Sequence, residues 1–357
     1  MYMWKKLVMA ASLAASSTAF AANELHLYNW NNYLSDATAK RFEASCKCKL
    51  VQDYYGDNEE MLAKLAAGAK GYDLVVPTGF AVQTLIGKGA AQPLDRAQIS
   101  NFKNLNPGYL GGFFDPKNQY SIPYAVTTTV LGYNETALKK AGVADKVNSW
   151  ALIFDPAVLA KIKGKVIVLD SQRELMAAAL MYLGKSANSA DPKDWAAARN
   201  VILKAKPYWA AFNNQSYIKE LTVGNMWVAL GYSNDLYQAE QDALKARRPF
   251  KIGFGLQKEG NTMSIDNFVV LKDAPRKDLA YKFINFMLEG KNGAELSNEM
   301  GTGSPNQAAM AYVKKDLAKT AAIFPDKASL GRLQQLKDLN TKQRRDLNRM
   351  WSEIKLK

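Results

Sequence analysis

The alternation of short apolar runs with amphipathic segments between residues 24 and 80 constrains the fold more than any other feature. Residues 24–29, 49–51 and 72–76 have the apolar pattern of strands, and residues 34–43 and 59–69 carry apolar side chains at helical spacing. Ser35 stands where a helix N-cap is expected, and Phe42 lies on the side of that helix that would face a core. Strand, helix, strand, helix, strand in this order predicts a mainly parallel sheet covered by helices.

The first strand ends in a polar, turn-prone patch, Asn-Trp-Asn-Asn-Tyr at residues 29–33. In an open α/β sheet, ligands bind just beyond the carboxyl ends of the strands. Trp30 and Tyr33 are therefore candidates for the wall of a binding cleft, and Phe80, which follows the strand at 72–76, is a candidate for the same cleft. The alternative is that these rings only cover the end of the sheet.

A second α/β region follows a long β-branched run at residues 121–133. Strand patterns lie at 165–169, 228–232, 252–256 and 265–271, and helical patterns lie at 175–183, 194–204, from 236 and from 279. The chain has 357 residues, and single cores rarely grow beyond roughly 250–300 residues. We predict a two-lobed α/β fold, each lobe a mainly parallel sheet flanked by helices, with a hinge of extended strands. Residues 22–126 and 264–300 would form lobe 1, and residues 127–263 and 301–357 would form lobe 2 and the closing helices.

The first 21 residues have the pattern of a secretory signal peptide. Lys5 and Lys6 precede an apolar stretch at 7–14, and Ala19 and Ala21 form an Ala-x-Ala cleavage site. No cysteine follows this site directly, and no later run approaches ~20 apolar residues. We expect an exported, soluble protein.

The chain carries 47 lysines and arginines against 33 acidic residues, a formal net charge of +14. Such an excess can indicate a nucleic acid or membrane partner. The basic residues are spread along the chain, however, and the densest group at 342–357 alternates with apolar residues at near-helical spacing. This pattern favours an amphipathic closing helix with a solvated basic face, and we expect no nucleic acid partner.

The two cysteines, Cys46 and Cys48, are separated by one residue. An exported protein can form disulfides, although a bond across one residue closes a tight loop. A metal site would need more donors than this pair and the single histidine, His26, supply. We expect no metal site, and the sequence leaves the oxidation state open.

Carboxylates recur where predicted strands end: Glu174 and Asp235 in the second region, and Asp266 where the chain returns. Each alone fits a helix cap. Together with Tyr232 and the aromatic residues of the first region, they suggest a box of rings and carboxylates. Aromatic faces attract cations by about 0.5–2 kcal/mol, and a carboxylate adds a charge-assisted hydrogen bond to an ammonium group. A small organic cation is the ligand that this combination indicates.

Several stretches carry a family resemblance: LYNWNNY, YDLVVP, SIPY, DSQRE, AAFN, GYSNDLYQA, the Asp266 segment and GTGSPN. With these, the chain resembles the spermidine/putrescine-binding proteins of bacterial ABC transporters over nearly all of its length after the signal peptide. The resemblance implies a monomeric, hinge-closing periplasmic receptor without a cofactor. Such a receptor holds a polyamine between aromatic rings and acidic residues, and delivers it to an inner-membrane ABC permease.

The resemblance also assigns candidate ligand-binding residues: Trp30, Tyr33, Thr78, Phe80, Glu174, Tyr232, Asp235 and Asp266, with Asn31 added beside Trp30. Three further candidates depart from the family pattern. Ser171 replaces an aspartate, Ser264 replaces a Trp or Phe, and Thr302 replaces a Tyr. Part of the aromatic wall is therefore missing, and another diamine or a guanidinium compound stays open as the ligand.

Two other functions are alternatives to the binding of a cation. The chain has no nucleophile elbow, zinc signature or phosphate-binding glycine loop, so only Glu174 and Asp235 offer an acid/base pair for an exported enzyme. We expect no enzymatic activity. Ferric-ion receptors of similar architecture use clustered tyrosines, but the adjacent pair Tyr54 and Tyr55 follows a strand of the first lobe rather than the second.

Overall fold

A computed structural model describes residues 23–31 and 33–356 of the chain. The predicted signal peptide, residues 1–21, lies outside the described residues. The strands are β1 (Glu24–Trp30), β2 (Lys49–Tyr55), β3 (Leu74–Val75), β4 (Ile122–Asn134), β5 (Val166–Val168), β6 (Ala211–Phe212), β7 (Val228–Tyr232), β8 (Ile252–Gly255), β9 (Asn261–Val270) and β10 (Leu333–Gln334).

The helices that precede β9 in the chain are α1 (Asp36–Cys46), α2 (Asn58–Ala66), α3 (Gly79–Gly87), α4 (Glu135–Lys140), α5 (Ala151–Phe154), α6 (Pro156–Leu159), α7 (Gln172–Tyr182), α8 (Pro192–Ala205), α9 (Tyr217–Thr222) and α10 (Ser233–Lys245). The later helices are α11 (Lys277–Met287), α12 (Gly290–Met300), α13 (Lys315–Ala318), α14 (Lys327–Leu330) and α15 (Thr341–Leu356). Short 3₁₀ helices are η1 (Arg96–Gln98), η2 (Ser100–Asn104), η3 (Pro107–Tyr109), η4 (Ala144–Lys146), η5 (Ala160–Ile162), η6 (Lys206–Tyr208) and η7 (Gln307–Ala311).

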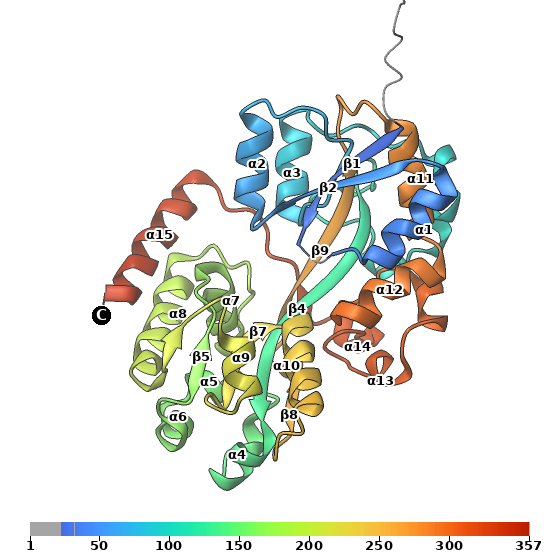
Figure 1. The fold of residues 1–357 in the computed structure, drawn as a ribbon. Helices are drawn as coiled ribbons and strands as arrows, with labels where there is room; N and C mark the ends of the chain where they lie inside the picture. The colour runs from blue at the N-terminus through green and yellow to red at the C-terminus, as the bar shows by residue number, and fades with distance from the viewer. Residues whose placement is uncertain (1–22, 32, 357) are drawn as a thin grey trace, which may run out of the picture.

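The sheet order is β2-β1-β3-β9-β4-β7-β5-β6, with β10 beside β9 and β8 beside β4. β1 pairs in parallel with β2 and β3, and β5 pairs in parallel with β6 and β7. β4 and β9 run antiparallel to each other and pass from one parallel set to the other. Figure 1 shows these two long strands joining an upper and a lower group of elements. The predicted two-lobed α/β fold is confirmed.

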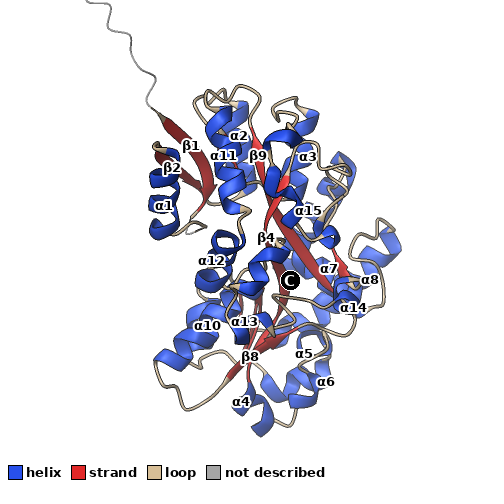
Figure 2. Cartoon of the chain, turned by 90° about the vertical axis from the view of Figure 1, so that its right-hand side faces the viewer, coloured by secondary structure: helices blue, strands red, loops and turns tan. Residues whose placement is uncertain are grey.

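Each parallel set has its own hydrophobic core. One core contains Tyr28, Phe42 and Phe283, and the other contains Trp150 and Leu230. β4 and β9 run through the middle of the molecule (Figure 2). On β4, Ile122, Tyr124 and Ala125 belong to the first core and Val130 and Leu131 to the second, so this crossover strand is shared by both cores.

Most predicted elements are present with shifted ends. Ser35 caps α1 and its Oγ accepts from the Thr38 amide, and Phe42 is buried, as expected. β2 continues to Tyr55, beyond the predicted end at residue 51, because residues 49–55 pair in register with residues 24–30 of β1. The C-terminal helix α15 forms as predicted and buries Leu347 and Ile354 against the second core. None of the helices in residues 23–31 and 33–356 is long and apolar enough to span a membrane.

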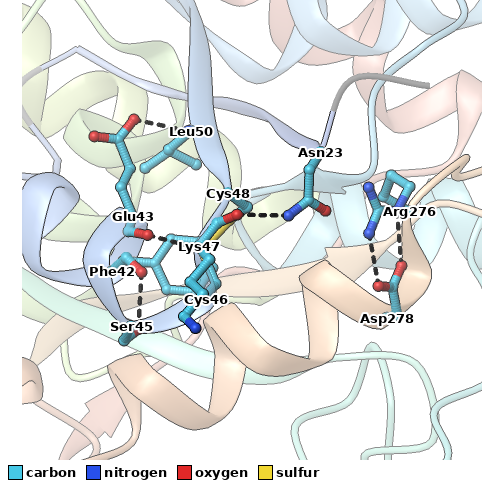
Figure 3. The surroundings of a disulfide bond; sticks show 10 residues. All are labelled: Asn23, Phe42, Glu43, Ser45, Cys46, Lys47, Cys48, Leu50, Arg276 and Asp278. Atoms are coloured by element: carbon cyan, nitrogen blue, oxygen red, sulfur yellow. Dashed lines mark hydrogen bonds and ion pairs between the residues drawn. A yellow bond between two sulfur atoms is a disulfide. The ribbon is translucent and has the colours of Figure 1, made fainter. Parts of the chain in front are cut away.

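The two cysteines form a disulfide in the turn between α1 and β2 (Figure 3). Lys47 between them has a left-handed backbone with φ of 53°, and its carbonyl accepts a hydrogen bond from Asn23 Nδ2 at 2.7 Å. This answers the question that the sequence left open. The bond lies at the edge strand of the sheet.

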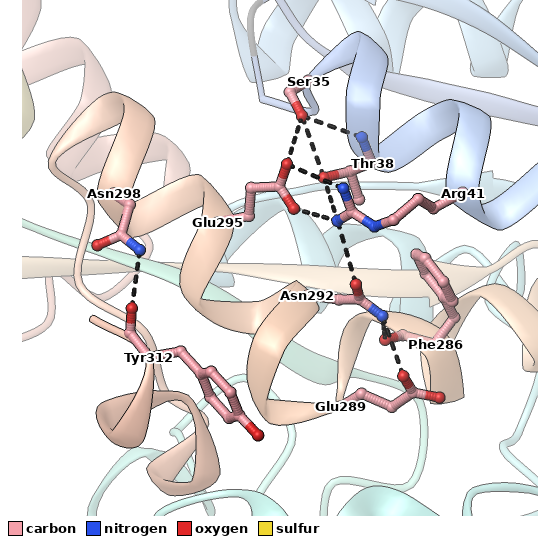
Figure 4. Close-up of polar contacts among 9 residues, drawn as sticks. All are labelled: Ser35, Thr38, Arg41, Phe286, Glu289, Asn292, Glu295, Asn298 and Tyr312. Carbon is pink, nitrogen blue, oxygen red and sulfur yellow. Dashed lines mark hydrogen bonds and ion pairs between the residues drawn. The ribbon is translucent and has the colours of Figure 1, made fainter. Parts of the chain in front are cut away.

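A polar network joins the first helix to α12 (Figure 4). Glu295 accepts hydrogen bonds from Ser35 and pairs with Arg41, which also contacts Asn292. Farther along α12, Asn298 donates to the Tyr312 carbonyl at 3.0 Å and accepts from the Lys314 amide at 2.8 Å. These contacts hold residues 312–314, which follow α12 in the chain, against that helix.

Candidate ligand-binding cleft

A cleft of about 930 Å³ lies between elements of the two cores. The ends of β1, β2 and β3 form one side, and the first turn of α7 with the end of β7 forms the opposite side. Residues 263–266 of β9 line its floor. The carboxyl ends of parallel strands therefore meet at this cleft, as the strand-end rule requires.

Asp266 is the buried acidic group on the side of the first core. Its side chain comes from β9 and the residue is 5% exposed. Thr78 Oγ1 donates to Oδ1 at 2.6 Å, and Tyr33 Oη donates to Oδ2 at 3.0 Å. Asn58 orients Thr78 through two hydrogen bonds of 3.1 Å. Burial raises the pKa of Asp266 to about 6, and the two hydrogen bonds oppose that rise.

The aromatic side chains beside Asp266 are held by their polar atoms. Trp30 Nε1 donates to the Val76 carbonyl at 2.8 Å, and the Trp30 ring lies 4.6 Å from that of Tyr55. The Tyr33 ring is 6.3 Å from Trp30 and its hydroxyl is fixed on Asp266. All three rings line the cleft, as does Phe80 in the first turn of α3. This side of the cleft combines ring surfaces with a carboxylate.

Glu174 is the buried acidic group on the opposite side. It lies in the first turn of α7, where the Ser171 Oγ caps the helix and accepts from the Glu174 amide at 3.4 Å. Its Oε2 accepts a hydrogen bond from Thr262 Oγ1 at 2.6 Å. Burial raises the pKa of Glu174, while hydrogen bonds from Thr262 and Thr129 and the charge of Arg173 act against it.

One strand therefore positions both carboxylates. Thr262, Ser264 and Asp266 occupy every second position of β9, so their side chains share one face of the strand. Asp266 projects from one end of this row, and Glu174 is bound to Thr262 at the other. Positions 262 and 266 are about 13 Å apart at a rise of about 3.3 Å per residue. Ser264 lies midway and is partly exposed in the cleft.

A two-lobed fold with a cleft at its strand ends is the architecture of a family of receptors. The sequence profile of the bacterial extracellular solute-binding proteins matches residues 37–325. The chain belongs to this family.

A putrescine/cadaverine-binding protein of Pseudomonas aeruginosa is 54% identical over 99% of this chain and 100% of its own length. The putrescine-binding periplasmic protein of Escherichia coli is 35% identical over 98% of this chain and 96% of its own. The crystal structure of a spermidine/putrescine ABC transporter substrate-binding protein from Streptococcus pneumoniae has a TM-score of 0.85 at 24% identity, covering 94% of this chain and 99% of that one, so it supports the fold.

The structure of this solute-binding protein brings most of the sequence candidates together. The candidates that line the cleft are Trp30, Asn31, Tyr33, Thr78, Phe80, Ser171, Glu174, Tyr232, Ser264 and Asp266. The other two lie outside its lining. Asp235 accepts hydrogen bonds from Tyr217 Oη and from Asn234 Nδ2, and burial raises its pKa. Thr302 is fully buried in the turn after α12.

Several lining residues of the solute-binding protein were not expected from the sequence. Tyr55 ends β2 and Asn58 begins α2 three residues later, so the strand-end rule applied to the full strand would have found them. Arg173 and Asn214 also line the cleft. The segment from Gln335 to Asn348 supplies a further wall, although in the sequence it reads only as a basic amphipathic helix and its lead-in.

The charges in the cleft differ from those of the whole solute-binding protein. The lining includes six carboxylates: Asp57, Glu59, Asp170, Glu174, Asp266 and Asp338. It includes two guanidinium groups, Arg173 and Arg344, and Arg344 is paired with Asp338 at 2.9 Å. A chain with a net charge of +14 thus contains a locally acidic cleft. The electrostatic potential of such a cleft raises the local concentration of cations.

Proposed function

We propose that this solute-binding protein captures a polyamine in the cleft, specifically a short α,ω-diamine of the putrescine and cadaverine class. In this proposal it works in the periplasm and delivers the diamine to an inner-membrane ABC permease. The family, the names of the two relatives above and the acidic cleft support this function.

The placement of two buried carboxylates along one strand is the observation that carries the proposal. Asp266 and Glu174 are tied to β9 positions 266 and 262, about 13 Å apart. With the two carboxylates taken to be as far apart as these strand positions, an ammonium–carboxylate contact of about 2.8 Å at each end leaves about 7–8 Å between two nitrogens. At about 1.25 Å per bond, given bonds of about 1.5 Å, an extended chain of five methylenes places its nitrogens about 7.5 Å apart and one of four methylenes about 6.3 Å apart, so cadaverine fits this gap and putrescine is shorter by about 1 Å. A triamine would place a third ammonium group beyond the pair.

Each lining group has a role in this proposal. Asp266 and Glu174 bind the two ammonium groups, and Thr78 orients Asp266. The rings of Trp30, Tyr33, Phe80 and Tyr232 contact the methylenes and attract the charges. Asn31, Ser171 and Ser264 contribute polar lining. Asp235 acts through Asn234, which it holds at the cleft, and Thr302 supports the turn after α12.

The proposed lobes follow the boundaries expected from the sequence: residues 22–126 with 264–300, and residues 127–263 with 301–357. A hinge on β4 and β9 near residues 126 and 264 is part of this proposal; it is supported by β4, which contributes Ala125 to one core and Val130 to the other, and by the pairing of β4 with β9. We propose that the protein acts as a monomer and is not an enzyme. In support of a non-enzymatic role, the matched family and both curated relatives are described as binding proteins.

A thermal-shift and calorimetric screen tests the proposal. The ligands are putrescine, cadaverine, spermidine, agmatine, an acidic and a neutral amino acid, and a sugar. At 100 times its dissociation constant a ligand stabilises the folded state by about 2.7 kcal/mol. We expect putrescine or cadaverine to give the largest shift and spermidine a smaller one. A shift with the sugar or the acidic amino acid and none with any diamine would refute the proposal.

A further inference from the structure

A cation of the protein itself stands beside the proposed binding site of the ligand. Arg173 precedes Glu174 in the first turn of α7, and both side chains line the cleft. The two groups do not pair here. Arg173 Nη2 donates to the Lys337 carbonyl at 2.6 Å, and Glu174 Oε2 accepts from Thr262. Burial lowers the pKa of Arg173, and the charges of Glu174 and Asp338 counteract this.

The carbonyl that binds Arg173 belongs to a short connection, residues 335–339, between β10 and α15, which we name the strap. Asn188, in the turn after α7, fastens the strap from both sides of Leu336. Its Nδ2 donates to the Gln335 carbonyl at 2.9 Å, and its Oδ1 accepts from the Lys337 amide at 2.8 Å. Asn188 does not line the ligand cleft. From outside the cleft, it therefore holds the segment whose carbonyl binds a cleft-lining cation.

Packing beneath the strap is incomplete. A cavity of about 190 Å³ lies there, lined by Arg173, Asn188, Trp195, Lys337 and Leu339, among others. On the side that faces this open pocket, the strap lacks packed side-chain neighbours. The hydrogen bonds of Asn188 consequently matter more for the position of the strap than they would over a filled core.

We propose that Arg173 is an internal competitor of the ligand, and that the strap, fastened by Asn188, keeps its guanidinium away from Glu174. A guanidinium group pairs strongly with a carboxylate, often through two hydrogen bonds. Once the Lys337 carbonyl is displaced, Arg173 turns to Glu174 and takes the place of the ligand's second ammonium group. Asn188 and the strap are thus positioning elements for affinity. This inference rests on the proposed binding of a diamine by Glu174.

A double-mutant cycle between Asn188 and Arg173 tests the inference. Asn188→Ala changes no charge, and we expect it to weaken putrescine or cadaverine binding about tenfold, equivalent to about 1.4 kcal/mol. Arg173→Gln removes the competitor and should bind at least as tightly as the wild type. In the Arg173→Gln background, Asn188→Ala should change the affinity by less than twofold.

Asn298→Ala is the matched control. Asn298 Nδ2 donates to the Tyr312 carbonyl (Figure 4) and Asn298 Oδ1 accepts from the Lys314 amide, the same pair of contacts that Asn188 makes, and Asn298 lies outside the cleft. We expect unchanged affinity from this variant, whatever stability it loses. Unchanged affinity in Asn188→Ala, equal weakening in both Arg173 backgrounds, or weaker binding in Arg173→Gln alone would each overturn the inference.

A measurement without ligand separates this inference from the proposed function. In the empty protein, ¹³C NMR of the Glu174 carboxyl follows its titration. Approach of Arg173 stabilises the ionised form, so Asn188→Ala should lower the Glu174 pKa by at least half a unit, and the additional Arg173→Gln change should abolish that shift. An unchanged Glu174 titration in Asn188→Ala overturns the inference. A wild-type protein that binds no diamine refutes the proposed function, while this titration still decides whether the strap controls Arg173.

Discussion

Thr78 and Asp266 are 188 residues apart in the chain and are joined twice in the fold. Thr78 Oγ1 donates to Asp266 Oδ1 at 2.6 Å, and the two backbones form an antiparallel bridge. Tyr33 donates to the other oxygen of the same carboxylate. Both oxygens are therefore oriented before any ligand arrives, and each retains lone pairs for an ammonium group. Such preorganisation reduces the ordering cost of binding.

Thr78→Val tests this orientation. The change removes a hydrogen bond to a charged group, and such bonds contribute about 1.5–3 kcal/mol. We expect diamine affinity to fall by an amount near the lower end of this range, measured by calorimetry at pH 7. Thr84→Val is a suitable control, because Thr84 bonds only the Phe80 carbonyl of its own helix and does not line the cleft. Equal affinities for the two variants would contradict the role given to Thr78.

The raised pKa of Asp266 predicts how the stability of the empty protein depends on pH. The folded-state pKa is about 6, above the usual 3.8. Folding thus favours the protonated carboxyl, and this stability is present below about pH 4 and is lost as the pH rises through about 6. The difference corresponds to about 3 kcal/mol at 1.36 kcal/mol per unit.

Urea unfolding of wild type and Asp266→Asn from pH 4 to pH 7.5 measures this effect. The wild type should lose stability relative to the variant across that interval, since asparagine does not titrate. The raised pKa values of Glu174 and Asp235 act in the same direction, but both residues are present in both proteins. Parallel stability profiles would show that Asp266 titrates normally. Saturating diamine should diminish the wild-type loss, because a bound ammonium group favours the ionised form.

The sequence predicts the first lobe well because its signals are local. Ser35 and Phe42 were assigned from spacing alone, and both have the expected roles. The neighbours of Asp266 follow instead from strand order. Only the placement of β9 next to β3 brings this aspartate to Thr78, and hydrophobic periodicity carries no information about which strands pair.

The strap and Asp235 illustrate what local signals miss. The strap lines the cleft because β10 pairs with β9 and α15 follows the strap. This arrangement depends on contacts between residues that are far apart in the chain. Asp235 follows a strand end, as a cleft carboxylate should. Its side chain nevertheless turns to Tyr217, which occupies the adjacent helix α9. The position of a residue in the sequence does not determine its rotamer.

Hinge closure is expected on binding, because the proposed anchors come from the two sides of the cleft. Two buried carboxylates without a counter-charge are costly, so a dication should favour a closed arrangement around it. Small-angle scattering should show a smaller radius of gyration at saturating putrescine or cadaverine. Asp266→Asn at the same ligand concentration should remain near the value of the empty protein. An unchanged radius for the ligand-saturated wild type would contradict closure about β4 and β9.

Ser264 offers a test of the cleft wall itself. It lies midway between the strand positions that hold the two carboxylates, and it faces the cleft without a large side chain. An indole ring here would contact the methylenes and add a cation–π interaction of about 1–2 kcal/mol in a largely desolvated site.

We therefore expect Ser264→Trp to tighten putrescine or cadaverine binding by about tenfold, equivalent to about 1.4 kcal/mol. Ser264→Ala, which removes only the hydroxyl, should change the affinity little. A larger cation such as agmatine should gain less from the tryptophan or lose affinity, because the ring fills volume that its guanidinium group would need. Calorimetric titration of the three proteins with each amine decides the matter. If the tryptophan variant binds the diamines no better than wild type, then this side of the cleft is already closed around the ligand by other residues, with Phe113, which also lines it, the first to be examined.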